Sequence, residues 1–139
     1  MSHRLNAADQ PAPVSLPELP ELPELPELPE FPEVPEPPYY AAIFTAIRTD
    51  TDPDGYQRTA ARLSRLVRGI PGFLGEDFAH TPGGLAVSVA YFRDLAGIER
   101  WRDHPEHLAA KRRGLERWYE RYALHIARVE HHHEFRRPA

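Results

Sequence analysis

The spacing of hydrophobic residues changes several times along the chain, and each change marks a predicted element. Residues 39–49 carry apolar side chains at both odd and even positions, which is typical of a strand covered on both faces. Residues 56–70 repeat apolar side chains at helical spacing until Gly-Ile-Pro-Gly-Phe ends the pattern. Residues 73–80 and 85–93 have strand patterns and are joined by Thr-Pro-Gly-Gly, so they predict an antiparallel hairpin.

The remaining hydrophobic positions predict further helix and a last strand. Asp94 is placed to cap a short helix, a second helical stretch occupies 105–122, and residues 123–132 form the final strand. Asp54, with Gln57 three residues later, is the predicted N-cap of the first helix. The order β-α-β-β-α-β, with the second helix divided at Asp-His-Pro, predicts an α+β, ferredoxin-like fold with an antiparallel sheet.

The predicted strands are apolar on both faces, although two helices cover only one face of a four-stranded sheet. A second copy of the chain would cover the other face if the two sheets closed into one barrel. We therefore predict a homodimer in the form of a dimeric α+β barrel. The alternative is that the N-terminal segment folds back over the same face.

An acidic arm at 1–38 precedes the barrel domain at 39–134 and a C-terminal tail at 135–139. Seven triplets of an apolar residue, Pro and Glu fill 16–36. This pattern favours polyproline II, whose three-residue turn aligns the apolar side chains in one row. A stiff spacer explains the arm, and so does docking of the row on a partner protein, a sister subunit or the domain itself. Repeat expansion in the DNA, without a role, is the third interpretation.

Charge and composition narrow the functional class. The arm contains eight acidic residues and one Arg, whereas the domain is mildly basic with charges of both signs interspersed, so nucleic acid is not a predicted partner. The chain has no cysteine, which excludes disulfides and thiolate chemistry. No stretch has the roughly 20 apolar residues that cross a bilayer, and the first thirty residues have no apolar run typical of a secretory signal. We expect a cytoplasmic protein without membrane contact.

Three segments resemble the antibiotic biosynthesis monooxygenase-like family: YYAAIFTAIRT, IPGFLGEDFAH and VSVAYFRDLAGIERWRDHPEHLAAKRRGLERWYERYALHIARVE. The resemblance covers residues 39–134 and implies a dimeric α+β barrel with a pocket between the helices and the barrel. Some members of the family oxidise polycyclic aromatic molecules with dioxygen and no cofactor, others degrade haem, and many have no known activity. We therefore predict a cofactor-independent monooxygenase-like enzyme acting on a small aromatic or polyketide-like molecule.

The haem-degrading branch of the family is a poorer match. Trp101 agrees with its pattern, but Lys111 stands where that branch has a His. That branch also has an Asn on the first strand, and the only Asn of this chain is Asn6, in the arm. We do not carry haem degradation over, and a haem or metal binder stays an alternative.

The candidate catalytic residues follow from helical spacing. His107, Lys111, Gly114 and Trp118 are separated by four, three and four residues, which places them on one face of a helix. His107 can serve as a base, Lys111 can hold the resulting oxyanion, and Trp101 with Trp118 can enclose a flat ring. The alternative is that His107 only begins the helix and that both tryptophans belong to the core.

Other aromatic residues complete the predicted substrate site. Tyr119 follows on the same helix and joins an apolar seam whose simplest interpretation is packing, made with Leu108, Leu115 and Tyr122. Phe44 and Tyr91 lie on strands, and the sequence leaves open which face of each strand lines the interior.

The histidine run at 131–133 alternates between two sides of the predicted last strand. Histidines clustered at a chain end are typically solvated, so no metal site is predicted. A non-catalytic dimer that binds a hydrophobic ligand and docks to a partner through its arm is the main alternative to an enzyme.

Overall fold

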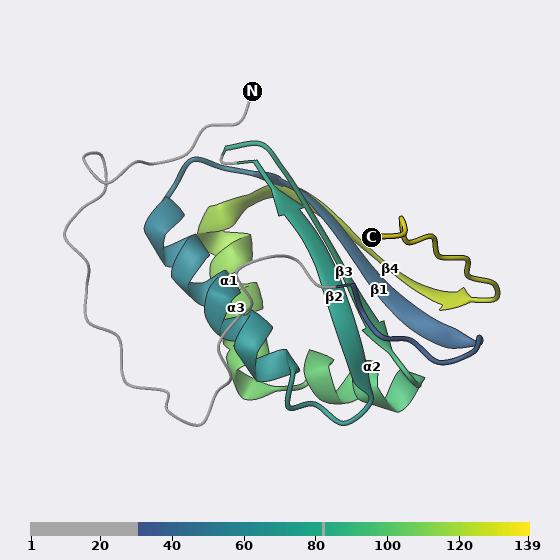
Figure 1. Ribbon diagram of the computed structural model, residues 1–139. Coiled ribbons are helices and arrows are strands. Elements are labelled where there is room, and N and C mark those ends of the chain that lie inside the picture. The colour runs from purple at the N-terminus through teal and green to yellow at the C-terminus, as the bar shows by residue number, and fades with distance from the viewer. Residues whose placement is uncertain (1–30, 82) are drawn as a thin grey trace.

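Four antiparallel strands form one sheet in the order β2-β3-β1-β4, with the helices packed on one face (Figure 1). The computed structural model describes residues 31–81 and 83–139, so most of the predicted arm lies outside the described residues. The elements are β1 (Tyr39–Arg48), α1 (Pro53–Val67), β2 (Phe73–His80), β3 (Leu85–Phe92), α2 (Leu95–Arg102), α3 (Pro105–Arg113), a π-helical turn η1 (Gly114–Trp118) and β4 (Tyr119–Val129). The predicted ferredoxin-like α+β fold is confirmed.

Polar caps define where the helices begin. Asp94 accepts a hydrogen bond from the backbone N–H of Gly97 at 2.9 Å, as the sequence predicts for the start of α2. The predicted cap of α1 is wrong, because Asp52 and not Asp54 accepts from the N–H of Gly55, at 3.1 Å. Pro53 explains the difference, since its fixed φ suits the first helical position and leaves the preceding residue as the cap.

The end of α3 differs from the prediction of one helix to residue 122. The α-helix ends at Arg113, and β4 begins at Tyr119. From Trp118 onwards the backbone pairs with the β1 segment instead of continuing the helix, since the N–H of Thr49 donates to the carbonyl of Trp118 at 2.8 Å. Gly114 permits this junction, because a Cβ at this position would lie 2.6 Å from Cε2 of Tyr119.

The predicted helical seam is therefore also wrong. Tyr119 and Tyr122 lie on β4 rather than on a helix. Leu115 is 65% exposed and Leu108 is exposed as well, so neither is a core residue. The run at 131–133 is likewise not part of a strand, because β4 ends at Val129.

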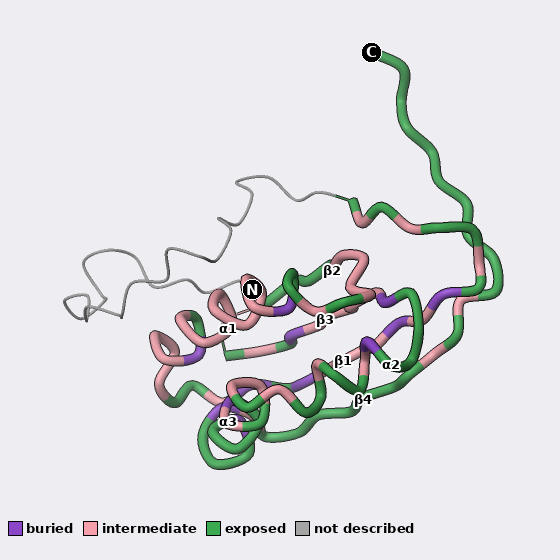
Figure 2. Tube along the Cα trace, turned by 90° about the horizontal axis from the view of Figure 1, so that it is seen from below, coloured by how far each residue is buried: buried purple, intermediate pink, exposed green. Residues whose placement is uncertain are grey.

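The two faces of the sheet have different surroundings. Cross-strand partners place Phe44 on the face that carries the helices, together with Tyr122 and Tyr119. Strand alternation puts Ile43 and Ile47 on the opposite, helix-free face. Figure 2 shows buried positions spread along β1 and at single positions of the helices, and long exposed stretches along β4.

The helix-free face is covered at one end only. Pro32 packs over Gly75, where an added Cβ would lie 2.5 Å from Cβ of Pro32, and the Tyr39 hydroxyl lies 3.2 Å from Nδ1 of His132. At the other end of the same face Ile47 is 39% exposed and Leu85 is 49% exposed. Within residues 31–81 and 83–139, none of the helices has the length and apolar composition needed to cross a membrane.

Candidate functional site

Aromatic rings gather between β1, α1 and the start of β4, on the face of the sheet that carries the helices. Phe44 lies 5.3 Å from Tyr119 and 5.4 Å from Tyr122, measured between ring centroids. Tyr56, from α1, makes edge-on contacts with Trp118 at 5.7 Å and Tyr119 at 6.1 Å. Such contacts stabilise a structure by about 0.5–1.5 kcal/mol each beyond burial. We call these five residues the aromatic cluster.

Arg48, the last residue of β1, lies inside this cluster. Its guanidinium carbon is 3.7 Å from the centroid of the Tyr56 ring, and the residue is only 5% exposed. Its Nε has no hydrogen-bond partner. None of the ion pairs between described residues includes Arg48, so its positive charge is buried without a carboxylate beside it.

The groups around Arg48 are uncharged at neutral pH. Burial lowers the pKa of His80, whose ring lies 5.6 Å from that of Tyr56, and the Arg48 charge lowers it further. Burial raises the pKa of Tyr56 and of Tyr119, and their hydroxyls share a hydrogen bond. The cluster therefore combines flat apolar rings, neutral hydroxyls and one cation, a combination that can bind an aromatic molecule and stabilise a negative oxygen.

His107 and Trp101 form a second group at the junction of α2 and α3. Their rings stack at 4.2 Å with an interplanar angle of 17°, and Nδ1 of His107 lies 2.9 Å from the carbonyl oxygen of Trp101. Because a carbonyl only accepts hydrogen bonds, Nδ1 carries the proton and Nε2 does not. Burial lowers the pKa of His107 to about 4, so the imidazole is neutral at pH 7.

The structure divides the predicted site residues among three places. Trp101 and His107 contact each other, and Lys111 is exposed one helical turn further along α3. Trp118 does not share a helical face with His107 and Lys111, because α3 ends at Arg113 and the π-helical turn follows. It packs in the aromatic cluster beside Tyr56. The predicted single helical face from residue 107 to residue 118 is thus wrong, because 3.6-residue spacing ends at Arg113.

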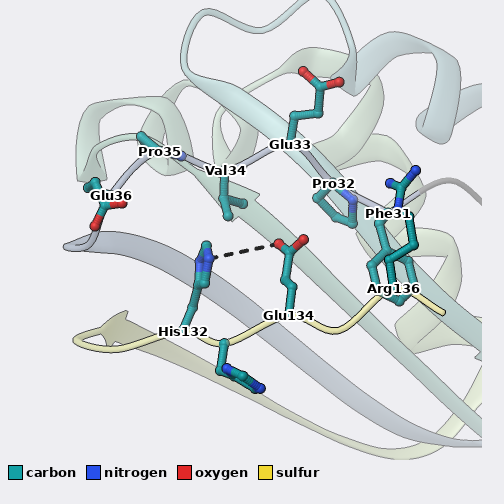
Figure 3. A pocket seen from close by; sticks show the side chains of 10 residues that line it. Phe31, Pro32, Glu33, Val34, Pro35, Glu36, His132, Glu134 and Arg136 are labelled. Carbon is teal, nitrogen blue, oxygen red and sulfur yellow. Dashed lines mark ion pairs between the residues drawn. The ribbon is translucent and has the colours of Figure 1, made fainter. Parts of the chain in front are cut away.

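Tyr91 lies on the helix-free face, where its ring is 6.0 Å from that of Tyr39. Together with Asp77, these two line an open pocket of about 210 Å³, which the end of the arm and the C-terminal segment also line. A wider groove of about 920 Å³ adjoins it, between residues 31–36 and the segment after β4. Figure 3 shows these two segments facing each other, with the ion pair of His132 and Glu134 at 3.9 Å.

Three residues in or beside the aromatic cluster were not predicted as site residues from the sequence: Arg48, Tyr56 and His80. A signal for Arg48 was present, since it shares the parity of Phe44 on a strand that is otherwise apolar on both faces. No group of three or more His, Cys, Asp or Glu side chains suited to a metal ion occurs among residues 31–81 and 83–139.

Solved structures of several proteins share this fold. A candidate antibiotic biosynthesis monooxygenase from Nitrosomonas europaea is 10% identical with a TM-score of 0.55, and the match covers 68% of this chain and 92% of that one. The cofactor-independent oxygenase SnoaB from Streptomyces nogalater is 13% identical with a TM-score of 0.53, over 63% of this chain and 90% of that one. A dimeric ferredoxin-like protein of unknown function from Thermobifida fusca is 19% identical with a TM-score of 0.57, over 72% and 100%.

The fold is therefore that of the antibiotic biosynthesis monooxygenase-like proteins, as the sequence predicts. A scan against models of known protein families finds no match. YqjZ, an uncharacterised protein of Bacillus subtilis (strain 168), is 42% identical over 94 residues, which are 68% of this chain and 82% of YqjZ. The chain belongs to the YqjZ family.

Proposed function

We propose that the protein is a cofactor-independent oxygenase that acts on a small aromatic molecule at the aromatic cluster. The observation that carries the proposal is the buried cation of Arg48 among the rings of Tyr56 and Tyr119. The fold shared with SnoaB supports the reaction class. Tyr122, which belongs to the cluster, and Leu124, which follows it on β4, are about half exposed and leave an apolar approach from solvent.

The reaction requires a substrate with an acidic methylene between aromatic or carbonyl groups. Loss of a proton from the methylene gives a carbanion that is delocalised onto oxygen, and this anion transfers its electrons to dioxygen. The methylene becomes a carbonyl and the second oxygen atom leaves as water, so that CH2 and O2 give C=O and H2O. No external reductant is consumed. A fixed cation lowers the free energy of the anion and of the step that forms it.

Two neutral imidazoles are candidates for the base. His107 presents an unprotonated Nε2 beside Trp101, and Lys111 follows it on α3. A pKa near 4 makes His107 a weak base, which favours an acidic substrate. His80 lies beside Tyr56 in the cluster itself. The catalytic roles of His107 and Lys111 stay predictions, and so does substrate binding by Trp101 and Tyr91.

Dioxygen uptake by the full chain tests the proposal. Anthrone is a suitable probe, because its methylene lies between two rings and next to no other reactive group. We expect one dioxygen consumed per anthrone oxidised without added metal or cofactor. Tyr119→Phe should slow the reaction about tenfold, and Tyr40→Phe, at the far end of β1, should leave it unchanged. His80→Gln and His107→Gln then identify the base, since only the variant that lacks it loses activity.

A non-catalytic ligand-binding protein is the second candidate. It is favoured by the contact of Pro32 with Gly75, which places the last part of the predicted arm against the domain. Anthrone binding, seen as quenching of tryptophan fluorescence, without any dioxygen uptake would select this alternative and refute the oxygenase.

We also propose that the protein is a homodimer that buries the helix-free face. The exposed side chains of Ile47 and Leu85 on this face support it, and the related fold from Thermobifida fusca is described as dimeric. Residues 31–36 would then lie at the rim of the interface. Sedimentation of the full chain should give about twice the 15.9 kDa mass, and a monomer at micromolar concentration would contradict the dimer.

A further inference from the structure

Two buried hydrogen-bond donors beside the ring of Tyr56 have no acceptor. One is Nε of Arg48 and the other is Nε1 of Trp118, which is only 3% exposed. Both side chains pack directly against Tyr56. Buried polar groups in proteins are almost always paired, because an unpaired one costs about 1–3 kcal/mol. Two such donors around the ring of Tyr56 are accounted for if an acceptor binds beside this ring.

The charge of Arg48 specifies what kind of acceptor this is. Several arginines of the described residues pair with carboxylates, for example Arg102 with Asp103 at 2.9 Å and Arg128 with Glu130 at 2.9 Å, whereas Arg65 shares with Arg48 a buried Nε that has no partner. Those pairs are exposed, whereas Arg48 is buried and contacts an aromatic ring in place of an anion. A buried charge without a counter-charge is strongly unfavourable, and a negatively charged ligand supplies the missing partner.

The surrounding rings specify the rest of the ligand. Phe44 and Tyr119 present aromatic surfaces within the same cluster, and Tyr122 continues it to the exposed part of β4. These rings contact one another, so a flat ligand ring would stack against their exposed edge at Tyr122 and not between them. A guanidinium fork adds a bidentate match to two oxygen atoms, as in a carboxylate.

We propose that Arg48 and Trp118 form the anion-binding end of the aromatic cluster, and that its ligand is a planar aromatic molecule with a negatively charged oxygen. The oxygen is either a carboxylate that the ligand already carries or an enolate formed in the reaction. This inference deepens the proposed function by naming the substrate class, and it rests on the same site. Binding measurements without turnover test this inference separately from the proposed function.

The test compares two ligands that share a ring and differ in charge. 2-Naphthoate is an anion at pH 7, and 2-naphthamide is its neutral analogue. Binding to the full chain is measured by calorimetry and by quenching of tryptophan fluorescence. We expect naphthoate to bind at least tenfold more tightly than naphthamide. Arg48→Met should abolish this preference, Arg48→Lys should keep part of it, and Arg93→Met, at an exposed arginine after β3, should leave it intact.

The folded state of each variant is checked independently. Replacing an unpaired buried charge with an apolar side chain of similar length is neutral or stabilising, so Arg48→Met should melt at or above the wild-type temperature in the absence of ligand. Naphthoate should raise the melting temperature of the wild type and not of Arg48→Met. Equal binding of naphthoate by wild type and Arg48→Met, or no binding by the wild type, would overturn the inference.

A third probe distinguishes the two sources of negative charge. 2-Naphthol has the same ring and becomes an oxyanion only at alkaline pH. If a pre-existing carboxylate is recognised, naphthol binds weakly at pH 7 and naphthoate binds tightly. If the site stabilises an oxyanion that forms on the bound ligand, naphthol ionises at a lower pH in the wild type than in Arg48→Met. A wild type that oxidises anthrone but binds naphthoate no more tightly than naphthamide would refute this inference and leave the proposed function in place, whereas dioxygen uptake unaffected by Arg48→Met would refute both.

Discussion

Replacing Gly114 with Ala tests how the π-helical turn positions the aromatic cluster. The backbone of Gly114 has φ −59° and ψ −46°, which any residue adopts, so the substitution introduces no backbone strain. The new Cβ would lie 2.6 Å from Cε2 and 2.8 Å from Cδ2 of Tyr119, about 1 Å closer than ordinary contact allows. The ring of Tyr119 must therefore move away from Gly114.

Two effects of opposite sign determine the free energy of this change. Ala favours helical backbone over Gly by about 1 kcal/mol, whereas overpacking of a core typically costs about 1–3 kcal/mol. Because Tyr119 also contacts Phe44 and Tyr56, its displacement loses ring contacts and the overpacking prevails. We expect a net loss of about 1–2 kcal/mol and a melting temperature lowered by roughly 5–10 °C for a domain of this size.

Thermal unfolding followed by circular dichroism measures the change. Gly69→Ala is the matched control, since Gly69 is exposed and its nearest neighbour to a Cβ is the carbonyl oxygen of Leu66 at 3.6 Å. This control should not lower the melting temperature. A Gly114→Ala protein as stable as the Gly69→Ala protein, with unchanged ligand binding, would refute the proposed role of Gly114.

Three further perturbations test other parts of the account. Burial lowers the pKa of His107 from 6.5 to about 4, so the unfolded chain binds the proton at a higher pH than the folded chain does. The stability that neutral His107 contributes is therefore complete above about pH 6.5 and is lost as the pH falls towards 4. In urea titrations, His107→Gln should remove up to about 3 kcal/mol of this pH dependence. If the unfolding free energy of His107→Gln changes with pH as steeply as that of the wild type, the burial of a neutral imidazole is contradicted. Asp94→Ala deletes the cap of α2 and should cost about 1 kcal/mol in the same titrations, while Asp50→Ala, at an exposed bend, should cost none. Replacing Ile47 and Leu85 together with Glu should convert the proposed dimer to monomers in sedimentation experiments, and an unchanged mass would place the interface elsewhere.

Hydrophobic spacing predicts most of the fold because each element repeats its own period. Residues 73–80 match β2 at both ends, and Asp94 caps α2 as predicted. The junction after α3 could not be predicted in the same way, because Leu-Glu-Arg after Gly114 has good helical propensity and a single Gly does not by itself end a helix. Pairing of Arg48 with Tyr119 across β1 and β4 overrides that local preference.

The candidate site was predictable only in part. Trp118, Tyr119 and Phe44 were selected as aromatic residues near a pocket, and the structure brings them together. Arg48 was missed because a charged residue at the end of a strand usually faces solvent, and only the tertiary contact with Tyr56 reveals its burial. Tyr91 was placed with Phe44 because the sequence does not distinguish the two faces of strands that are apolar on both sides.

A crystal structure of the full chain with 2-naphthoate tests the central claim most directly, because the predicted site residues are divided among three different places. The account predicts a carboxylate within hydrogen-bond distance of the Arg48 guanidinium and a naphthyl ring against Tyr56 and Tyr119. A ligand bound instead between Trp101 and Lys111, or on the helix-free face beside Tyr91, would contradict it.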